Sequence, residues 1–363
     1  MHLTNKCHLA HTQNMKNAPS IIDVKNKYGS TETCVKYLEA VRWPEGVRCL
    51  SCGGDKISKF VTNETTRERT NRKGVTKEVR VPARHLYTCL EPSCGFQFSP
   101  TAGTIFHDTH LPLEKWFQAV ALMCNAKKGL SAKQMERDLG VTYRTAWYLN
   151  HRIRKAMEDG APGLLTGVCE ADETFIGGAF DRRRKRARNE KQPVFGALQR
   201  AKDGQASKVR SFPIPVSSGS VLTAAVKNTI STEAELFITD ESGAYKKVGR
   251  QYQHETVNHI RLEYVRRGDP RSIHTNSIEN FWSLFNRGII GSFHKVSVKH
   301  LRRYLDEFTF RFNNRKAEDL FGLVMMNLVI ATGIKYADLV KNTDQPKDDA
   351  EPYSGPRSSY EPW

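Results

Sequence analysis

The sequence predicts a mixed α/β protein in which two smaller modules precede the main domain. Two close pairs of cysteines lie between about residues 43 and 100, and helical periodicity dominates 111–158. From about 165 to 335, apolar β-prone runs alternate with helical ones. A chain of 363 residues has room for two or three domains. The expected order is therefore a cysteine module, a helical module and an α/β domain.

The charge balance points to a polyanionic partner. The chain has 56 Lys and Arg against 39 Asp and Glu, a formal net charge of +17, which favours nucleic acid or an acidic membrane. A solubilising surface is the weaker alternative. No apolar run is long enough for a transmembrane helix, and residues 1–20 lack the apolar core of a signal peptide. We therefore expect an intracellular, reducing compartment, where cysteines serve as ligands or buried thiols.

The cysteine module has the spacing of a zinc site. Cys49 and Cys52 form one close pair, and Cys89 and Cys94 form a second, so four thiolates can surround a tetrahedral zinc ion. Glycines follow both pairs, and the segment between them reads as strands with a basic arm, which predicts a zinc ribbon. The alternative is four unrelated buried cysteines. A ribbon can contact DNA or protein, and that choice stays open. The remaining cysteines are expected to be buried thiols, with the first of them loose at the terminus: Cys7, Cys34, Cys124 and Cys169.

The helical module contains a candidate helix-turn-helix. Ser131 is a suitable cap for one helix, Gly140 allows a turn, and Thr142 is a suitable cap for a second helix. The second helix can enter a DNA major groove. An ordinary helical hairpin with a solvated basic face is the alternative. The side chains expected on the outward face of the second helix are Tyr143, Arg144, Arg152 and Lys155.

Three acidic residues occur in settings that allow them to converge. Asp172 lies in a strand-like run, where alternation puts it on the same face as Glu170 and opposite to Glu173. Asp240 ends an apolar strand, and Glu279 lies on a helix beside an apolar stripe. Carboxylates from two strands and a helix can hold two divalent ions for in-line attack at a phosphodiester. Taken singly, each acid is more simply a solvated or capping residue.

Several polar side chains are candidates for contact with the phosphate backbone. Asn286 lies two helical turns after Glu279, and the basic run at 181–188 follows the first acidic strand. His274 and Asn276 precede Glu279 and are weaker candidates, because a lone histidine is usually structural. A second basic face is expected at Lys299, Arg302 and Arg303.

These motifs together resemble a known family. ADETFIGG, ITDESGAY, the long segment from HTNSIENFW to RFNNR, the CLSC ribbon and the GTIF–PLEKWF junction are similar to the DDE transposases of bacterial insertion sequences. The resembling group has an N-terminal zinc ribbon and is related to the Merlin superfamily. The resemblance covers about residues 30–335.

The resemblance implies a ribonuclease-H-like catalytic core with a metal-binding triad of Asp172, Asp240 and Glu279. It further implies Mg²⁺ (or Mn²⁺) at that triad, structural Zn²⁺, and cleavage and joining of double-stranded DNA at the element's terminal repeats and its target. A homo-oligomer on DNA, in the bacterial cytoplasm and nucleoid, is expected. The implied parts are a lead-in at 1–42, a zinc ribbon at 43–105, a helix-turn-helix region at 106–160, the catalytic domain at 161–337 and a disordered tail at 338–363.

One position departs from the family pattern. Family members often carry lysine where this chain has Asn286, which keeps a hydrogen-bond donor but loses the charge, and the adjacent Arg287 points about 100° away around the helix. Two other interpretations remain: a DNA-binding regulator derived from a transposase, and a structure-selective nuclease. The residues expected to contact DNA are Arg144, Arg152, Arg182, Arg183, Arg184, Lys185, Arg186, Asn286 and Arg287.

Overall fold

The computed structural model describes residues 18–70, 74–158, 160, 163–177, 191–202, 204, 206–258, 265–266 and 272–341. Cys7, the basic run at 181–188 and residues 342–363 of the tail predicted at 338–363 lie outside these residues, whereas the first residues of that tail belong to a helix that ends at Val340. The chain divides into two compact units. Unit 1 comprises Met1–Asn125 and Phe321–Leu339, and unit 2 comprises Ala126–Leu320 and Val340–Trp363. None of the described helices has both the length and the hydropathy needed to cross a membrane.

The helices of unit 1 pack around an aromatic cluster. Ser20 and Ser30 cap the first two helices through reciprocal hydrogen bonds with the third residue of each helix, so the predicted lead-in is a pair of helices. The rings of Tyr28 and Tyr37 lie 4.9 and 5.4 Å from that of Phe117. The helices are α1 (Ile21–Lys27), α2 (Thr31–Arg42), α3 (Leu113–Asn125), α10 (Leu320–Ile330) and α11 (Tyr336–Val340).

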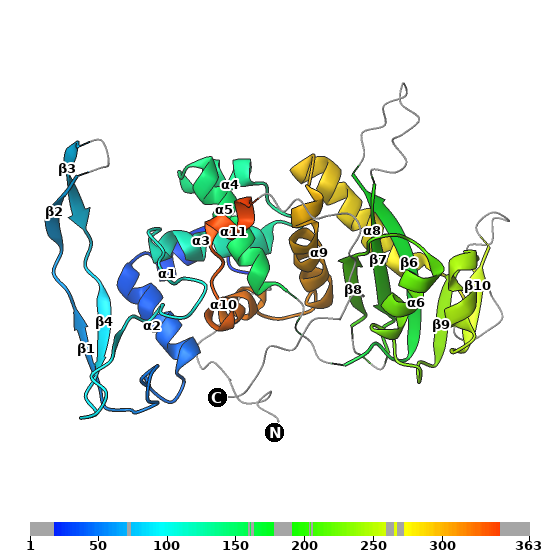
Figure 1. Cartoon of the computed structure of the whole chain (residues 1–363), viewed down its shortest axis with the longest axis horizontal. Coiled ribbons are helices and arrows are strands. Elements are labelled where there is room, and N and C mark those ends of the chain that lie inside the picture. The colour runs from blue at the N-terminus through cyan, green and yellow to red at the C-terminus, as the bar shows by residue number, and fades with distance from the viewer. Residues whose placement is uncertain are drawn as a thin grey trace. The chain divides into compact units, whose positions relative to one another are not determined.

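The cysteine module of unit 1 has two separate sheets (Figure 1). The first has the order β1-β4-β5 and is antiparallel, with strands β1 (Ile57–Val61), β4 (His85–Cys89) and β5 (Gln97–Phe98). The second is a two-stranded ribbon of β2 (Thr65–Thr70) and β3 (Thr76–Val81). The core of the module is small, with Tyr87 and Phe98 beside Cys49 and Cys89.

Unit 2 contains a mixed five-stranded sheet with the order β10-β9-β6-β7-β8. Strands β6, β7 and β8 form an antiparallel meander, and β9 and β10 run parallel to β6. The sheet and its helices confirm the predicted α/β class. The strands are β6 (Val168–Ile176), β7 (Gln192–Gln199), β8 (Lys208–Pro213), β9 (Leu236–Asp240) and β10 (His254–Val257).

Helices cover both faces of this sheet (Figure 1). On one face, Leu222 and Val226 of α6 (Gly219–Lys227) pack against the strand residues Ala171 and Phe195. On the other, α8 (Asn276–Gly288) and α9 (Val298–Asn313) pack against Val194 and Leu198. The short elements are η2 (Gly243–Tyr245), α7 (Lys246–Gly249) and a π-helix, η4 (Ile289–Phe293). The strand side chains thus alternate between two apolar layers.

The predicted turn between two helices is present in unit 2. Helix α4 (Ala132–Leu139) begins after the cap Ser131 and ends at Gly140, whose φ of 59° is left-handed and suits glycine. Helix α5 (Tyr143–Ala156) begins after the cap Thr142. The reciprocal half of a capping box is not made at Ser131, because the Gln134 side chain donates to Asp138 instead.

Helix α5 is joined to α9 by a buried ion pair. Arg154 Nε donates to Glu307 Oε2 at 2.7 Å, and both side chains are almost wholly buried. Arg311 also binds Glu307, at 2.9 Å, and the guanidinium of Arg154 lies 4.0 Å from the ring centre of Tyr304. Removing one partner from a buried ion pair of this kind strongly destabilises the fold. The α4–α5 pair is therefore fixed to the helical layer of the sheet.

A pair of histidines between α5 and α9 is expected to make unit 2 less stable in acid. His151 is fully buried, its ring centre lies 4.7 Å from that of His300, and among the described residues neither of its nitrogens has a hydrogen-bond partner. Burial lowers the pKa of His151 to about 2, and the nearby positive charge of Arg154 adds to the effect. The folded state therefore takes up no proton at this ring, whereas the unfolded chain does so near pH 6.5.

Stability is accordingly expected to fall as the pH drops below about 6.5, because the unfolded state binds the additional proton. Between pH 7.5 and 5.5, His151 should contribute a loss of about 1.4 kcal/mol in the free energy of unfolding. The His151→Phe variant should lack that part of the loss. Urea unfolding of both proteins at the two pH values measures the difference, and an equal pH dependence would contradict the assignment.

Candidate active site and metal centre

The first two acidic residues lie side by side on adjacent parallel strands. In the register of β6 and β9, Glu170 is the partner of Ile238, so the same register continued by two residues puts Asp172 beside Asp240. Side chains at the same level of parallel strands project from the same face. Val168, Leu236 and Ile238 share that parity and pack together in one cluster. Both carboxylates therefore project from the face opposite to α6.

Helix α8 brings the third acidic residue to the same face. Asp172 pairs across the sheet with Gly196 of β7. A Cβ atom at Gly196 would come within 2.3 Å of Trp282 of α8, so glycine is required for the helix to pack this closely. Glu279 precedes Trp282 by three residues and lies on the adjacent turn. Helix α8 therefore holds Glu279 one turn away from the Trp282 ring, and that ring packs on Gly196, the strand partner of Asp172.

The charges of the three acids affect one another. Burial raises the pKa of Asp172 to about 7, and the negative charges of Glu173, Asp240 and Glu279 contribute to the rise. Glu279 is exposed, and Asp172 and Asp240 are partly exposed, so all three are accessible to solvent. Among the described residues, the only group of three or more ligands within 4.8 Å of one another is a set of cysteines. The three carboxylates do not form such a tight group in this structure.

Hydrogen bonds orient two of these carboxylates. The hydroxyl of Thr275, the residue before α8, donates to Glu279 Oε1 at 2.8 Å. The backbone N–H of Ser242 donates to Asp240 Oδ1 at 3.1 Å.

A buried glutamate fixes the beginning of α8. Glu170 Oε2 accepts hydrogen bonds from the backbone N–H groups of Ser277 and Ile278, each at 2.9 Å. Its other oxygen accepts from Arg200 Nε at 2.6 Å, and Arg200 also donates to the carbonyl oxygen of His274 at 2.7 Å. A carboxylate at a helix N-terminus binds amides that have no partner within the helix. Glu170 therefore ties β6 to the helix that carries Glu279.

Sequence reasoning placed Glu170 on the face of Asp172 but did not assign it a role, and it missed Arg200. The available signal was an acidic residue two positions before Asp172 in an otherwise apolar strand. His274, singled out as a weak candidate, lies inside this network, with Nδ1 3.1 Å from Arg200 Nη2.

A second carboxylate, on the opposite face of β6, holds the segment after Asp240. Glu173 accepts a hydrogen bond from the Tyr245 hydroxyl at 2.8 Å and from the Ser217 hydroxyl at 3.1 Å. Burial raises the pKa of Glu173, which Tyr245 and Ser217 partly counteract. Because Tyr245 follows Asp240 by five residues, this contact anchors the turn that ends β9. Sequence reasoning missed Tyr245 and Ser217.

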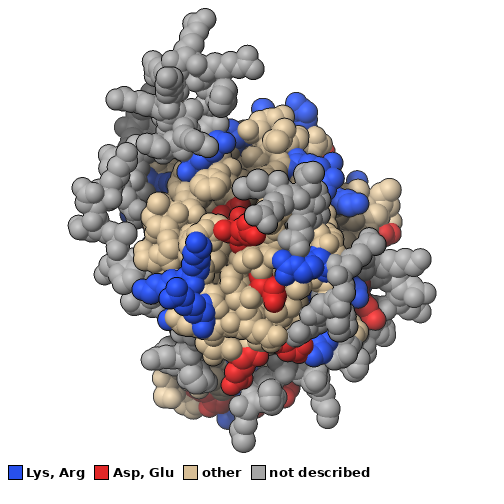
Figure 2. All heavy atoms as spheres, turned by 90° about the vertical axis from the view of Figure 1, so that its right-hand side faces the viewer, with Lys and Arg blue, Asp and Glu red and all other residues tan. Residues whose placement is uncertain are grey.

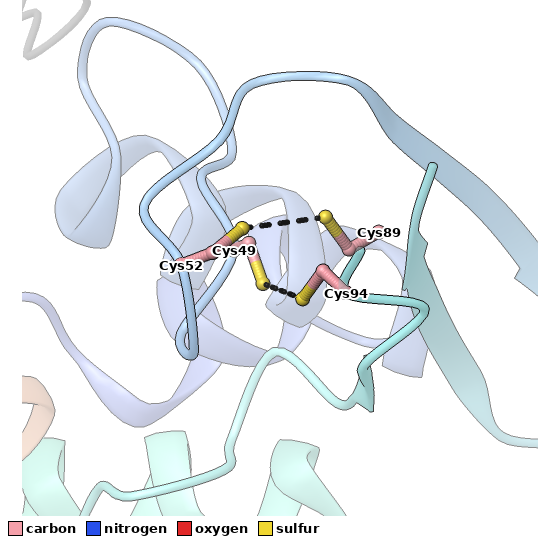
Figure 3. Close-up of side chains that lie close together, drawn as sticks. All are labelled: Cys49, Cys52, Cys89 and Cys94. Atoms are coloured by element: carbon pink, nitrogen blue, oxygen red, sulfur yellow. Dashed lines mark hydrogen bonds between the residues drawn. The ribbon is translucent and has the colours of Figure 1, made fainter. Parts of the chain in front are cut away.

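The four predicted zinc ligands converge on one point (Figure 3). The Sγ atoms of Cys49 and Cys94 are 3.6 Å apart, as are those of Cys52 and Cys89, and all four lie within 4.8 Å of one another. Sulfurs about 2.3 Å from a tetrahedral zinc ion would be ~3.8 Å apart. The cysteines are free thiols, so the spacing fits a structural zinc ion.

The turns of the cysteine module also suit a metal centre. Gly53 and Gly95 follow the two cysteine pairs with φ of 76° and 57°, the left-handed region that favours glycine. The backbone N–H of Ser51 donates to Cys49 Sγ at 3.4 Å, as expected for a thiolate ligand. Three other cysteines are buried, as predicted: Cys34, Cys124 and Cys169.

Two segments of the chain match known protein families. Residues 164–313, which include all three acids, match the model of the ISXO2-like transposase domain. Residues 29–97, which include all four cysteines of the centre, match the transposase zinc-ribbon domain. The chain contains an ISXO2-like transposase domain and a transposase zinc ribbon. The predicted identity, an insertion-sequence transposase with an N-terminal zinc ribbon, is thereby confirmed.

A relative and a solved structure extend the comparison. This transposase is 25% identical over 298 residues to an uncharacterized protein in transposable element ISH50 of Halobacterium salinarum, covering 78% of this chain and 90% of the relative. It is also similar to a chain in the cryo-EM structure of a simian T-cell lymphotropic virus intasome in complex with PP2A regulatory subunit B56 gamma. That likeness has a TM-score of 0.26 and 12% identity over 66% of this chain and 80% of the other. A likeness with so low a TM-score supports no assignment of an element or a residue.

The structure corrects one residue expected on the outward face of α5 of the transposase. Arg144 is exposed, but Arg152 is only 5% exposed and stacks on Tyr148. The prediction that Arg152 faces solvent is wrong, because its side chain is buried and lies over the Tyr148 ring of the same helix. Lys155 is partly buried and binds Glu158.

The other predicted DNA contacts differ in how accessible they are. Arg287 is exposed and donates to the carbonyl oxygen of Ser283, while Asn286 is partly buried on α8. Residues 182–186 are outside the described residues. Figure 2 shows acidic side chains near the middle of one face of unit 2, with lysine and arginine side chains on either side. Exposed basic residues on and after α7, close in sequence to Asp240, are Lys246, Lys247 and Arg250.

Proposed function

We propose that this transposase cleaves and joins DNA strands at the terminal repeats of its element, with Asp172, Asp240 and Glu279 as the divalent-metal ligands. One observation carries the proposal: Asp172 lies beside Asp240 in a parallel register, and α8 packs on Gly196 so that Glu279 reaches the same face. The sheet order, three antiparallel strands followed by parallel ones, supports a ribonuclease-H-like core.

The donor set suits Mg²⁺ or Mn²⁺. Carboxylate oxygens are the ligands that these ions prefer. Two-metal centres of this kind hold ions ~3.5–4 Å apart between carboxylates from separate chain segments, and Asp172, Asp240 and Glu279 come from two strands and a helix. Bound there, the ions would activate the attacking oxygen and stabilise the leaving one. The positive charge of bound ions would counteract the raised pKa of Asp172 and favour the ionised carboxylate.

The chain's own residues hold this site in shape. Glu170 and Arg200 fix the start of α8, and Glu173 with Tyr245 fixes the turn after Asp240, so the three acids come from supported backbone segments. In the first step, water attacks the phosphorus, and the bond to the 3′-oxygen of the element breaks with a proton passing to that oxygen. In the second, the freed 3′-hydroxyl attacks a target phosphodiester and displaces its 3′-oxygen. No covalent protein intermediate is required.

Recognition of the DNA end is assigned to the α4–α5 pair acting as a helix-turn-helix. Its turn at Gly140 and its exposed Tyr143 and Arg144, at the start of α5, suit entry of that end of the helix into the major groove. Asn286 and Arg287 on α8 are the residues proposed to contact phosphate near the acids. Because two ends of an element must be processed together, a homo-oligomer on DNA is expected.

The test is a strand cleavage and joining assay with Mg²⁺ on a labelled duplex that carries the flanking terminal repeat. We expect metal-dependent cleavage at the 3′ end by the wild type, and a loss of at least about 100-fold in Glu279→Gln, which keeps the shape but removes the charged ligand. Glu241→Gln is the matched control, since Glu241 is an exposed acid beside Asp240 with no assigned role.

Tight binding of the end by the wild type, without cleavage in any divalent ion, would instead support a regulatory protein. In that case Asn286→Lys, which restores the charge that the family carries, is the next protein to assay. Equal cleavage by Glu279→Gln and the wild type would remove Glu279 from the site.

A further inference from the structure

The β2–β3 ribbon has no evident role in stabilising the fold. It is inserted between β1 and β4, on the chain segment that separates the two cysteine pairs, and it continues beyond the ends of those strands (Figure 1). All residues of β2 are exposed, and in β3 only Val79 and Val81 are partly buried. An isolated two-stranded hairpin is at best marginally stable in water. A surface so exposed is better explained by a binding partner than by packing.

The register gives the ribbon two chemically different faces. Arg67 pairs with Val79, and Arg69 pairs with Lys77, so three cations and no acid share one face. On the opposite face, Glu68 pairs directly with Glu78. Like charges directly opposite each other destabilise a strand pair. The sequence thus keeps an unfavourable pair on one face while it gathers positive charge on the other.

Only one arginine of the two strands has its charge matched within the described residues. Arg80, on the face of the two glutamates, donates to Glu64 at 2.6 Å through Nη2. No ion pair to a described residue is found for Arg67, Arg69 or Lys77. The basic face, which we define as Arg67, Arg69 and Lys77, therefore presents uncompensated charge, whereas the other face is net acidic.

We propose that the basic face of the β2–β3 ribbon docks on duplex DNA, with the ribbon lying in or across the major groove. This inference rests on the proposed function, because it takes DNA as the substrate. The major groove admits a two-stranded ribbon, and Arg67 and Arg69 project from the same face ~7 Å apart along the strand. The paired glutamates face away from the phosphates, which fixes the side that binds.

The chemistry of the basic face favours DNA over a protein partner. Its uncharged residues are Thr65, Val79 and Val81, and it offers no large aromatic anchor of the kind that dominates protein interfaces. Its cations match a polyanion, and each phosphate contact displaces condensed counterions. The affinity contributed by this face must therefore depend steeply on salt.

The experiment measures binding of the whole protein to the terminal-repeat duplex over a range of KCl concentrations. The variant Arg67→Ala/Arg69→Ala/Lys77→Ala is expected to bind at least about tenfold more weakly near 0.1 M salt. Its plot of log affinity against log salt should be shallower by about 2–3, since each lost phosphate contact removes ~0.9 from the slope. Zinc content and thermal unfolding should match the wild type, which shows that the module is folded.

The matched control is Glu68→Gln/Glu78→Gln, which removes two negative charges from the opposite face of the same ribbon. Docking by the basic face predicts an affinity within about twofold of the wild type, whereas general attraction by net charge predicts tighter binding. Wild-type affinity and slope in the triple variant would overturn the proposal, as would a change in oligomeric state with DNA affinity unchanged, which would identify a second copy as the partner.

The outcome is separate from that of the proposed function. If the triple variant at saturating concentration cleaves as fast as the wild type, the ribbon contributes to DNA binding and not to the cleavage step. If the wild type cleaves nothing but the triple variant still loses affinity and slope, the proposed function fails and the docking face stands.

Discussion

Removal of zinc by a chelator is expected to unfold the β1–β4–β5 sheet while the mixed sheet of unit 2 stays folded. The cysteine module has a core of only a few side chains around Tyr87 and Phe98, which is too small to offset the loss of chain entropy. Structural zinc contributes about 10–16 kcal/mol in small zinc modules, so its loss exceeds the stability of a typical domain.

Hydrogen exchange measures this prediction residue by residue. Amides of β1 and β4 should lose protection after chelation or in Cys89→Ser, whereas those of β6, β7 and β9 should keep it. Cys34→Ser is the matched control, because Cys34 is a buried thiol outside the cluster whose Sγ contacts the carbonyl oxygen of Tyr28. Protection of β1 and β4 that survives chelation would show that the thiols do not hold a structural metal.

Replacement of Glu170 by alanine is expected to destabilise unit 2 by about 3–5 kcal/mol and to slow DNA cleavage. The substitution leaves Arg200 largely buried without its carboxylate and removes the acceptor of two amides at the start of α8. Since α8 carries Glu279, loosening its first turn should reduce the rate of cleavage even under conditions where the protein remains folded.

Urea unfolding gives the stability change, and a double-mutant cycle shows its origin. In Glu170→Gln/Arg200→Gln both charges are absent, so the pair should lose less stability than the sum of the two single variants. Additive losses, or a change below about 1 kcal/mol in Glu170→Ala, would mean that the ion pair does not support the helix. Because Glu170 acts through α8, the expected kinetic signature is a lower rate at saturating DNA with little change in affinity.

The local patterns of the sequence were enough to predict much of the site. Alternation along β6 put Glu170 and Asp172 on one face, and the apolar run before Asp240 predicted a buried strand; both hold in the structure. The helical stripe of Ile278, Phe281 and Phe285 is buried as expected. These features depend on periodicity within one segment, which the sequence displays directly.

Contacts between distant segments could not be predicted in this way. Arg200 follows β7 and binds both Glu170 of β6 and the carbonyl oxygen of His274 in the segment before α8. The sequence around each of these residues does not show that the three segments lie together. Arg152 was predicted on the outward face because the periodicity of its own helix does not show that this side chain is buried. The unit boundary after Asn125, within the predicted helix-turn-helix region, likewise depends on which helices pack together.

The buried bond between Arg154 and Glu307 has a consequence for how this transposase would select a cutting position. Helix α5 and the sheet belong to one unit, and a fully desolvated ion pair joins α5 to the helix packed on that sheet. If α5 contacts the bases of the DNA end, the three acids lie at a fixed distance from those bases. The rigid protein would then fix the number of base pairs between the recognised sequence and the cut. DNA with a different spacing could be cut only if the DNA is deformed.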